Sequence, residues 1–194
     1  MDSLMNNDSG STVADLHTKR YYRNHGGFLW VDRHGIDHRA DTLLTYLQKV
    51  DEMGFKTKHF YVNQITQDLE RLHSLNLGDG NEDINHVMAR LEYRLTKSYL
   101  RYVGGQRFGF VNPSFVLNRL DSIAPNPYDS IKRAVRYRGL FDVKMQHASD
   151  AFFHLALQQL KSKVDVDGEE TEKSRLAAFL KDVQPKSPFY YTLP

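Results

Sequence analysis

The sequence of 194 residues contains no cysteine, which excludes a thiol nucleophile, a disulfide framework and a cysteine-ligated metal site within these residues. No apolar run approaches the roughly 18 residues that a membrane-spanning helix needs, and no basic-then-apolar signal opens the chain. An excess of one charge is absent too, since 26 Lys and Arg face 24 Asp and Glu, for a formal net charge of +2. That charge is too small to indicate a nucleic-acid partner. The G-x-S-x-G turn that presents a catalytic serine is also missing.

What the sequence does contain is a succession of amphipathic helices. Hydrophobic residues make up 40% of the chain and charged residues 26%, which is ordinary for a globular protein. We predict a mostly α, compact multi-helix domain of about seven or eight helices with short extended clips, one of which carries Trp30. This single domain spans residues 13–194. The polar segment 1–12 is expected to be a disordered leader or linker.

The longest helical pattern runs from about residue 85 to Gly104 and Gly105. Its apolar residues recur at three- and four-residue spacing, which predicts one buried face made of Ile84, Val87, Met88, Leu91, Leu95, Tyr99 and Tyr102. We predict that the glycine pair ends this helix, because glycine enters the left-handed region without steric cost. Asn112 and Pro113 would then begin the next helix, as N-cap and first helical residue.

Two patterns resemble parts of metal sites. His34 and His38 are four residues apart, a spacing that brings two imidazoles together on a helix, but the sequence places no third ligand. The acidic loops at 79–83 and 165–169 alternate like the start of a calcium loop, yet both lack the glycine and glutamate that complete one. We therefore predict no metal, no cofactor and no catalytic residue in this chain.

A basic and aromatic set is the candidate for contact with a partner. Its members are Arg101, Arg107, Phe108, Phe110, Arg133, Arg136 and Arg138. Such interleaving could stack on sugars or bases, or hold an acidic polymer. In the alternative interpretation, the apolar neighbours of the last three arginines face the core and leave a solvated basic face, which the small net charge favours.

Three segments, in order along the chain, resemble motifs of a known family. Tyr21 to Val31, followed by an Ala-Asp-Thr-Leu-Leu run at 40–44, is similar to an opening "(F/Y)Y-x-x-R-x-(F/Y)-x-x-x-W" and an "A-x-x-L-L" helix. Residues Leu95 to Pro113 resemble "LT-x-x-(F/Y)-L-x-Y", a gap and "G-x-(V/I)-(D/N)-P", although Phe108-Gly109-Phe110 replaces a single glycine. Leu180 to Tyr190 resembles a closing "L-x-x-L-x-P-x-x-P-x-Y". These motifs belong to the N-terminal scaffold domain of large multidomain L,D-transpeptidases, enzymes that cross-link the bacterial cell wall.

The resemblance implies a non-catalytic scaffold that positions a downstream cysteine transpeptidase domain, which would lie beyond Pro194. The implied partners are that domain of the same polypeptide and peptidoglycan, and the implied location is the periplasm or cell envelope. The basic and aromatic set would then contact the neighbouring domain or the wall. Two alternatives stay open: a stand-alone helical binding module for peptidoglycan or an envelope partner, and a small enzyme that uses histidine and carboxylates, such as a lytic glycosidase.

Overall fold

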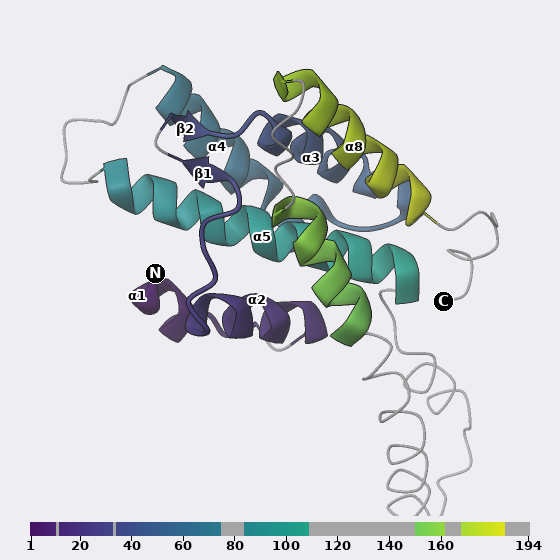
Figure 1. The fold of residues 1–194 in the computed structure, drawn as a ribbon, viewed down its shortest axis with the longest axis horizontal. Coiled ribbons are helices and arrows are strands. Elements are labelled where there is room, and N and C mark those ends of the chain that lie inside the picture. The colour runs from purple at the N-terminus through teal and green to yellow at the C-terminus, as the bar shows by residue number, and fades with distance from the viewer. Residues whose placement is uncertain (11, 33, 75–83, 109–149, 162–167, 185–194) are drawn as a thin grey trace, which may run out of the picture.

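The computed structural model describes residues 1–10, 12–32, 34–74, 84–108, 150–161 and 168–184 (Figure 1). Within these residues the protein is mostly helical with one two-stranded sheet, which confirms the predicted class. In chain order the elements are α1 (Asp2–Asn6), α2 (Val13–Arg23), β1 (Val31–Asp32), β2 (Gly35–Ile36), α3 (Arg39–Leu47), the 3-10 helices η1 (Val50–Met53) and η2 (Thr57–Phe60), α4 (Val62–His73), α5 (Ile84–Phe108), a helix over residues 150–161, and α8 (Gly168–Asp182). No helix in these ranges has the length and apolar character needed to cross a membrane.

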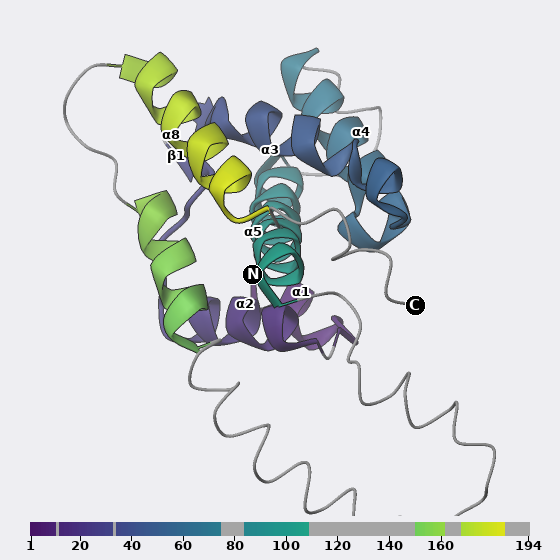
Figure 2. The ribbon, with the colours of Figure 1, turned by 90° about the vertical axis from the view of Figure 1, so that its right-hand side faces the viewer.

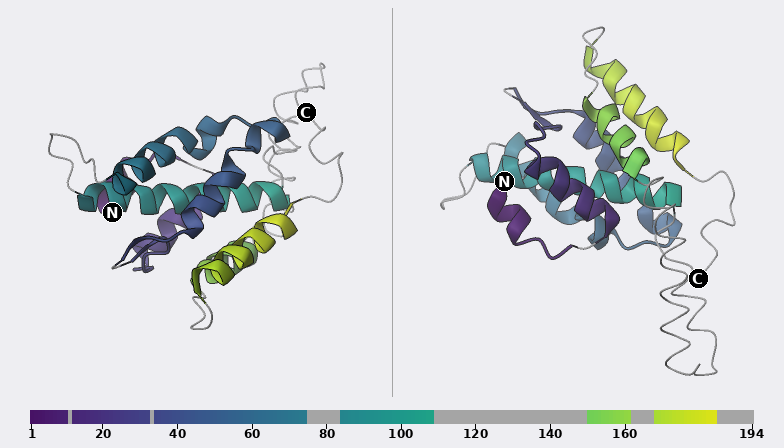
Figure 3. Two further views of the ribbon diagram at one scale, coloured as in Figure 1. Left: turned by 90° about the horizontal axis from the view of Figure 1, so that it is seen from above. Right: turned by 60° about the horizontal axis from the view of Figure 1, so that its bottom comes forward.

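The long helix α5 is the centre of the architecture. It contacts α2 on one side, and α3, α4 and η2 on others. Figure 2, in which α5 is seen nearly end-on, shows the remaining helices arranged around it. Helix α8 packs against α3 and runs beside it (Figure 3). Helix α5 therefore has other elements packed against it on several sides.

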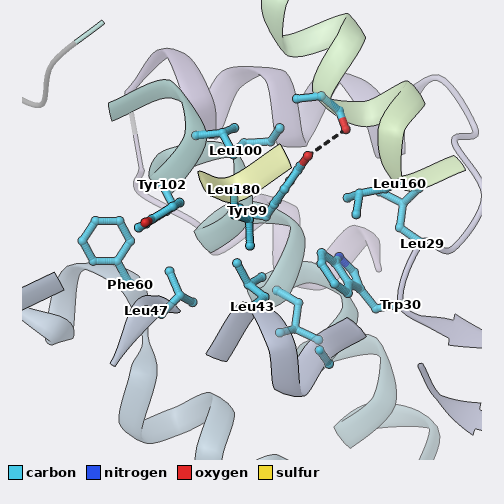
Figure 4. Close-up of a cluster of buried hydrophobic side chains, with 14 of the residues drawn as sticks. Leu29, Trp30, Leu43, Leu47, Phe60, Tyr99, Leu100, Tyr102, Leu160 and Leu180 are labelled. Carbon is cyan, nitrogen blue, oxygen red and sulfur yellow. Dashed lines mark hydrogen bonds between the residues drawn. The ribbon is translucent and has the colours of Figure 1, made fainter. Parts of the chain in front are cut away.

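The predicted buried face of α5 is largely correct. Val87, Leu91, Leu95, Tyr99 and Tyr102 are buried, whereas Met88 is half-buried and Ile84, at the first position of the helix, is 39% exposed. Tyr99 and Tyr102 lie in the hydrophobic cluster with Trp30, Leu43 and Leu180 (Figure 4). The Tyr99 hydroxyl donates a hydrogen bond to the carbonyl of Ala156, 3.1 Å away, so its polar end is satisfied inside the core.

The prediction that Gly104 and Gly105 end the helix is wrong, because α5 continues through both to Phe108. A Cβ atom added to Gly104 would lie 2.6 Å from Cζ of Phe153, on the helix over residues 150–161. The glycine at this position therefore allows two helices to approach closely.

The N-terminal segment also differs from expectation. We expected residues 1–12 to be disordered, but the structure folds Asp2–Asn6 as α1 and buries Met5 against Tyr22 and Tyr93. Thr12 then opens α2 with a capping box, in which its side chain accepts from the Asp15 N–H and Asp15 accepts from the Thr12 N–H. The polar composition of the segment did not predict this structure, because contacts with Tyr93 and Lys97 of α5 stabilise it.

Other expectations are met in part. The apolar spacing over 37–53 predicts one helix, which the structure divides into α3 and η1, and the extended clip at 28–31 leads into the β1–β2 hairpin. The same spacing predicts helices over 147–161 and 171–183, which correspond to the helix at 150–161 and to α8. Asn-Pro pairs predict helix starts at 112 and 126, and the sequence also allows an edge strand at 140–145; these segments and the chain end lie outside the described residues.

Candidate functional site

The structure places two side chains of the predicted contact set. Arg107 is exposed near the end of α5. The guanidinium of Arg101 instead donates hydrogen bonds to other groups of the protein. Phe108 is the last residue of α5, and nothing is described of its side chain. The other members lie outside the described residues: Phe110, Arg133, Arg136 and Arg138. The described residues therefore do not show whether the members of the predicted set lie close together.

Arg101 forms a two-pronged ion pair with Asp15 of α2. Its Nε donates to Oδ1 at 2.7 Å and its Nη2 donates to Oδ2 at 3.0 Å. The guanidinium also donates to the carbonyl of His59 and lies over the ring of Tyr61, 5.3 Å from its centroid. Burial alone would raise the pKa of Asp15, but the hydrogen bonds and charge of Arg101 lower it. Arg101 thus joins α2, α5 and η2.

Lys97, one helical turn before Arg101, is a buried cation that the sequence analysis did not identify. Its side chain is 2% exposed. The ammonium donates to Asp8 Oδ1 at 2.6 Å and to the hydroxyl of Tyr61 at 3.0 Å, and it lies 3.8 Å from Asp15 Oδ1. One feature of the sequence could have indicated this cation: Lys97 and Arg101 are four residues apart, so they lie on the same side of α5, next to its apolar face.

Asp8 is the second carboxylate of this group. Oδ1 accepts from the Gly10 N–H at 2.8 Å as well as from Lys97, and Oδ2 accepts from the Tyr93 hydroxyl at 2.8 Å. Lys19 lies 3.9 Å from Oδ2. Burial would raise the pKa of Asp8, but the hydrogen bonds from Lys97, Gly10 and Tyr93 and the charge of Lys97 lower it to about 2.

We call this group the N-terminal charge cluster; its residues are Asp8, Asp15, Lys19, Tyr61, Tyr93, Lys97 and Arg101. Both of its carboxyl groups have lowered pKa values, so both are ionised at neutral pH. Glycoside hydrolysis requires one acid with a raised pKa to protonate the leaving group. The two carboxyl groups of the cluster therefore lack the acid with a raised pKa that a glycosidase needs. The cluster instead links α2, α5 and η2 through charged hydrogen bonds.

A second buried network surrounds Glu92 of α5, which is 0% exposed. Its carboxylate accepts the backbone N–H groups of Leu29, Trp30 and Val31 at 2.8, 2.9 and 3.1 Å. The Tyr22 hydroxyl donates to it at 2.5 Å. Burial raises the pKa of Glu92, and these hydrogen bonds oppose that rise. The network fixes the tryptophan-bearing clip to the central helix.

Two further buried ion pairs join distant elements. Arg39, 3% exposed, donates from Nη1 to the Leu160 carbonyl at 2.9 Å and from Nη2 to the Leu29 carbonyl at 3.0 Å, and it lies 2.6 Å from Asp37. Asp68 of α4 accepts hydrogen bonds from two arginines of α5, at 2.7 and 3.0 Å from Arg90 and at 2.9 Å from Arg94. Arg39 thus links the start of α3 to the clip and to the helix at 150–161. Asp68 links α4 to α5.

The described residues give little sign of a chemical site. Every fully buried side-chain nitrogen or oxygen among them has a hydrogen-bond partner. No three His, Asp or Glu side chains in these ranges lie close enough together to hold a metal ion; His34 stands at the hairpin and His38 at the start of α3. The arrangement can hold helices in fixed positions, and its polar groups are used for that purpose.

Comparison with known proteins identifies a family. A family model described as a scaffold domain matches residues 16–142. No curated protein matches the chain, and no solved structure matches it. The matched segment begins inside α2 and includes all of α5, so it contains Lys19, Glu92, Lys97 and Arg101.

Proposed function

Because the chain belongs to the scaffold-domain family, whose model covers more than half of it, we propose that it is the scaffold domain of an L,D-transpeptidase-like enzyme of peptidoglycan cross-linking. In this role it performs no chemistry. It positions a downstream cysteine transpeptidase domain, and through it the peptidoglycan stem peptides, in the periplasm or cell envelope. The downstream domain would join those peptides through a thioacyl-cysteine step.

The observation that carries the proposal is the family match, read together with the three ordered motifs. The first motif, at Tyr21 to Val31, and the second, at Leu95 to Pro113, both fall within the family-matched segment. In the structure these two motifs meet, because the indole N–H of Trp30 in the first donates to the hydroxyl of Thr96 in the second at 3.0 Å. Glu92, just before the second motif, also accepts the N–H groups of the clip that ends the first. The motif residues therefore support one another as parts of a frame.

The buried ion pairs support a positioning role. A domain that orients another domain needs elements that keep fixed relative positions. Here α5 is joined through Glu92, Lys97 and Arg101 to segments from the first third of the chain, and Arg39 joins that third to the helix at 150–161. Buried ion pairs of this kind select one arrangement of helices at some cost in desolvation.

The first test is the natural reading frame that follows Pro194. We expect it to encode a domain with a cysteine nucleophile, and intact-mass spectrometry of the full product incubated with donor muropeptides should detect a thioacyl adduct on that cysteine. Replacing the cysteine by serine should abolish the adduct. A reading frame without such a segment would refute the proposal.

The second test addresses positioning. Arg107→Glu inverts an exposed charge of the predicted contact set, and Lys49→Glu inverts an exposed charge between α3 and η1 as a matched control. In the full-length enzyme we expect Arg107→Glu to lower the yield of 3-3 cross-links several-fold at unchanged thermal stability, with Lys49→Glu near wild type. Equal activity of the two variants would remove Arg107 from the domain contact.

The stand-alone binding module makes a different prediction. The isolated chain would be retained on purified sacculi, and a triple alanine variant of Arg133, Arg136 and Arg138 would not. Retention without any downstream transpeptidase segment would favour that alternative over the scaffold role.

A further inference from the structure

The N-terminal charge cluster contains Lys97, whose side chain is 2% exposed. A buried ammonium without an anion is strongly unfavourable, so Lys97 requires a carboxylate beside it. Asp8, in the short segment that precedes α2, supplies such a carboxylate at 2.6 Å.

We propose that Lys97 and Tyr93 form a carboxylate-binding site of the scaffold domain, and that Lys19 holds the backbone of the segment that fills it. Asp8 fills this site as an intramolecular ligand, and the carboxylate of another peptide can replace it. The inference concerns this chain alone and does not depend on the transpeptidase assignment.

Two side-chain donors hold the carboxylate of Asp8, and a third holds the backbone around it. Lys97 donates to Oδ1 of Asp8 at 2.6 Å and Tyr93 donates to Oδ2 at 2.8 Å. Lys19 donates to the backbone carbonyls of Asp8 and Gly10 at 2.7 and 3.0 Å, and it lies 3.9 Å from Oδ2. The donors come from α2 and α5, which pack directly against each other. Lys97 also donates to the hydroxyl of Tyr61 at 3.0 Å and lies 5.2 Å from the centroid of that ring, so Tyr61 helps to position the ammonium.

The second carboxylate of the cluster is already engaged. Asp15 accepts two hydrogen bonds from Arg101 and one from the Thr12 N–H, and it lies 3.8 Å from the Lys97 ammonium. Asp8, at 2.6 Å, is therefore the direct partner of Lys97. Removing Asp8 leaves a gap in the coordination of Lys97 that Asp15 does not close.

The segment that delivers Asp8 is short and lies at the edge of the protein. Within α1, Met5 is the buried residue, and the Asp8 side chain is 10% exposed against 2% for Lys97. Asp8 is therefore the more exposed partner of the pair, and a competing carboxylate would meet Lys97 from the side of Asp8. Gly10 packs against the pair, because a Cβ there would lie 2.7 Å from Lys97 Nζ and 2.6 Å from Asp15 Oδ2.

The chemistry favours a carboxylate over a phosphate. Asp8 presents two oxygens to Lys97, Tyr93 and the Gly10 N–H, and it carries one negative charge. A phosphate would bring more oxygens than the site has donors and nearly a second negative charge, which ionised Asp15 would repel. We therefore expect the ligand to be an acidic side chain or a C-terminal carboxylate of a peptide.

The first experiment restores the missing carboxylate chemically, in the full chain. Asp8→Ala is melted in increasing sodium acetate and, at equal ionic strength, in sodium chloride or sodium phosphate. We expect acetate alone to raise the Tm, saturating in the millimolar range at about 3 °C above the chloride curve. Asp51→Ala, which removes an exposed carboxylate from η1, is the matched control and should show no acetate-specific rise.

The second experiment identifies the site and the exchange. Adding Lys97→Met to Asp8→Ala should abolish the acetate effect. A labelled peptide of residues 1–12 should bind the Asp8→Ala chain, at least tenfold more tightly than the same peptide with Asp8→Asn. Gly10→Ala, which retains every donor, should also admit the peptide because the covering segment is pushed away from Lys97.

Each negative result has a defined meaning. Equal stabilisation by acetate and chloride would overturn the carboxylate site, and equal stabilisation by phosphate would overturn its selectivity. Acetate rescue without any binding of the Asp8 peptide would overturn replacement by another chain. These outcomes are independent of whether a transpeptidase domain follows Pro194.

Discussion

Gly104 of α5 and Phe153 of the facing helix meet so closely that a Cβ on the glycine would lie 2.6 Å from Cζ of the phenylalanine. A glycine in a helix interior costs about 1 kcal/mol relative to alanine. Here that cost is accepted because the missing side chain leaves room for an aromatic ring that belongs to the core. The contact fixes how near the helix at 150–161 comes to α5.

We predict that Gly104→Ala lowers the free energy of unfolding by about 1 to 2 kcal/mol, because overpacking outweighs the gain in helix propensity. Urea denaturation measures the change. Gly27→Ala, where an added Cβ meets nothing within 4 Å, should be nearly neutral. Adding Phe153→Leu should relieve the clash, so that the Gly104→Ala change costs less in that background. Additive effects of the two substitutions would contradict the proposed contact.

Acid should weaken the N-terminal charge cluster. The pKa of Asp8 falls from 3.8 to about 2 on folding, so the folded state holds this carboxylate ionised to lower pH than the unfolded chain does. Its contribution of about 2 kcal/mol is present above pH 4 and is lost as the pH falls towards 2. We expect the stability difference between wild type and Asp8→Asn to shrink over this interval, as measured by denaturant titrations at each pH. A constant difference would argue against the ion pair with Lys97.

Glu92→Gln should destabilise the protein by about 2 to 4 kcal/mol, although the side chain keeps its shape. The amide NH2 would face backbone N–H groups of the clip where an acceptor is needed. The fluorescence of Trp30 should report a loosened clip in the same denaturation curves. Glu52→Gln, at an exposed position of η1, serves as the control. A loss no larger than that of the control would show that the three N–H groups do not depend on the carboxylate.

His17 should titrate below its ordinary range. Burial lowers its pKa, and the charge of Arg20 does so too, while Asp150, 2.8 Å from Nε2, opposes them. Because the folded-state pKa lies below the unfolded value near 6.5, this histidine contributes stability that is lost as the pH falls below 6.5. Asp150→Asn should lower the pKa of His17 further in an NMR titration, with Asp51→Asn as the control. An unchanged or higher pKa in Asp150→Asn would contradict the assignment.

The helical class and most of the long buried stripe could be predicted, because helical periodicity is a local property of the sequence. The role of Gly104 could not, since Phe153 is far away in the chain and the glycine signal for a helix end is the same in either case. Lys97 was missed for a similar reason: its partner Asp8 precedes it by 89 residues. The low net charge also concealed a cluster in which opposite charges are concentrated and buried.

The candidate contact set shows the same limit. Arginines interleaved with aromatic residues predicted a surface for a partner, and Arg107 remains available for one. Arg101 instead has an internal partner in Asp15, which a linear pattern cannot reveal. Composition identified the residue types of an interface, whereas the fold decided which of them reach solvent.

The contact between Glu92 and the clip has a consequence for the order of folding. The three amides that it collects precede it by 61 to 63 residues, so a long loop must close before any of these hydrogen bonds can form. The carboxylate must already stand on a formed turn of α5 to receive them. The tryptophan clip is therefore expected to dock late, after the central helix, and weakening it should speed unfolding while leaving the refolding rate almost unchanged.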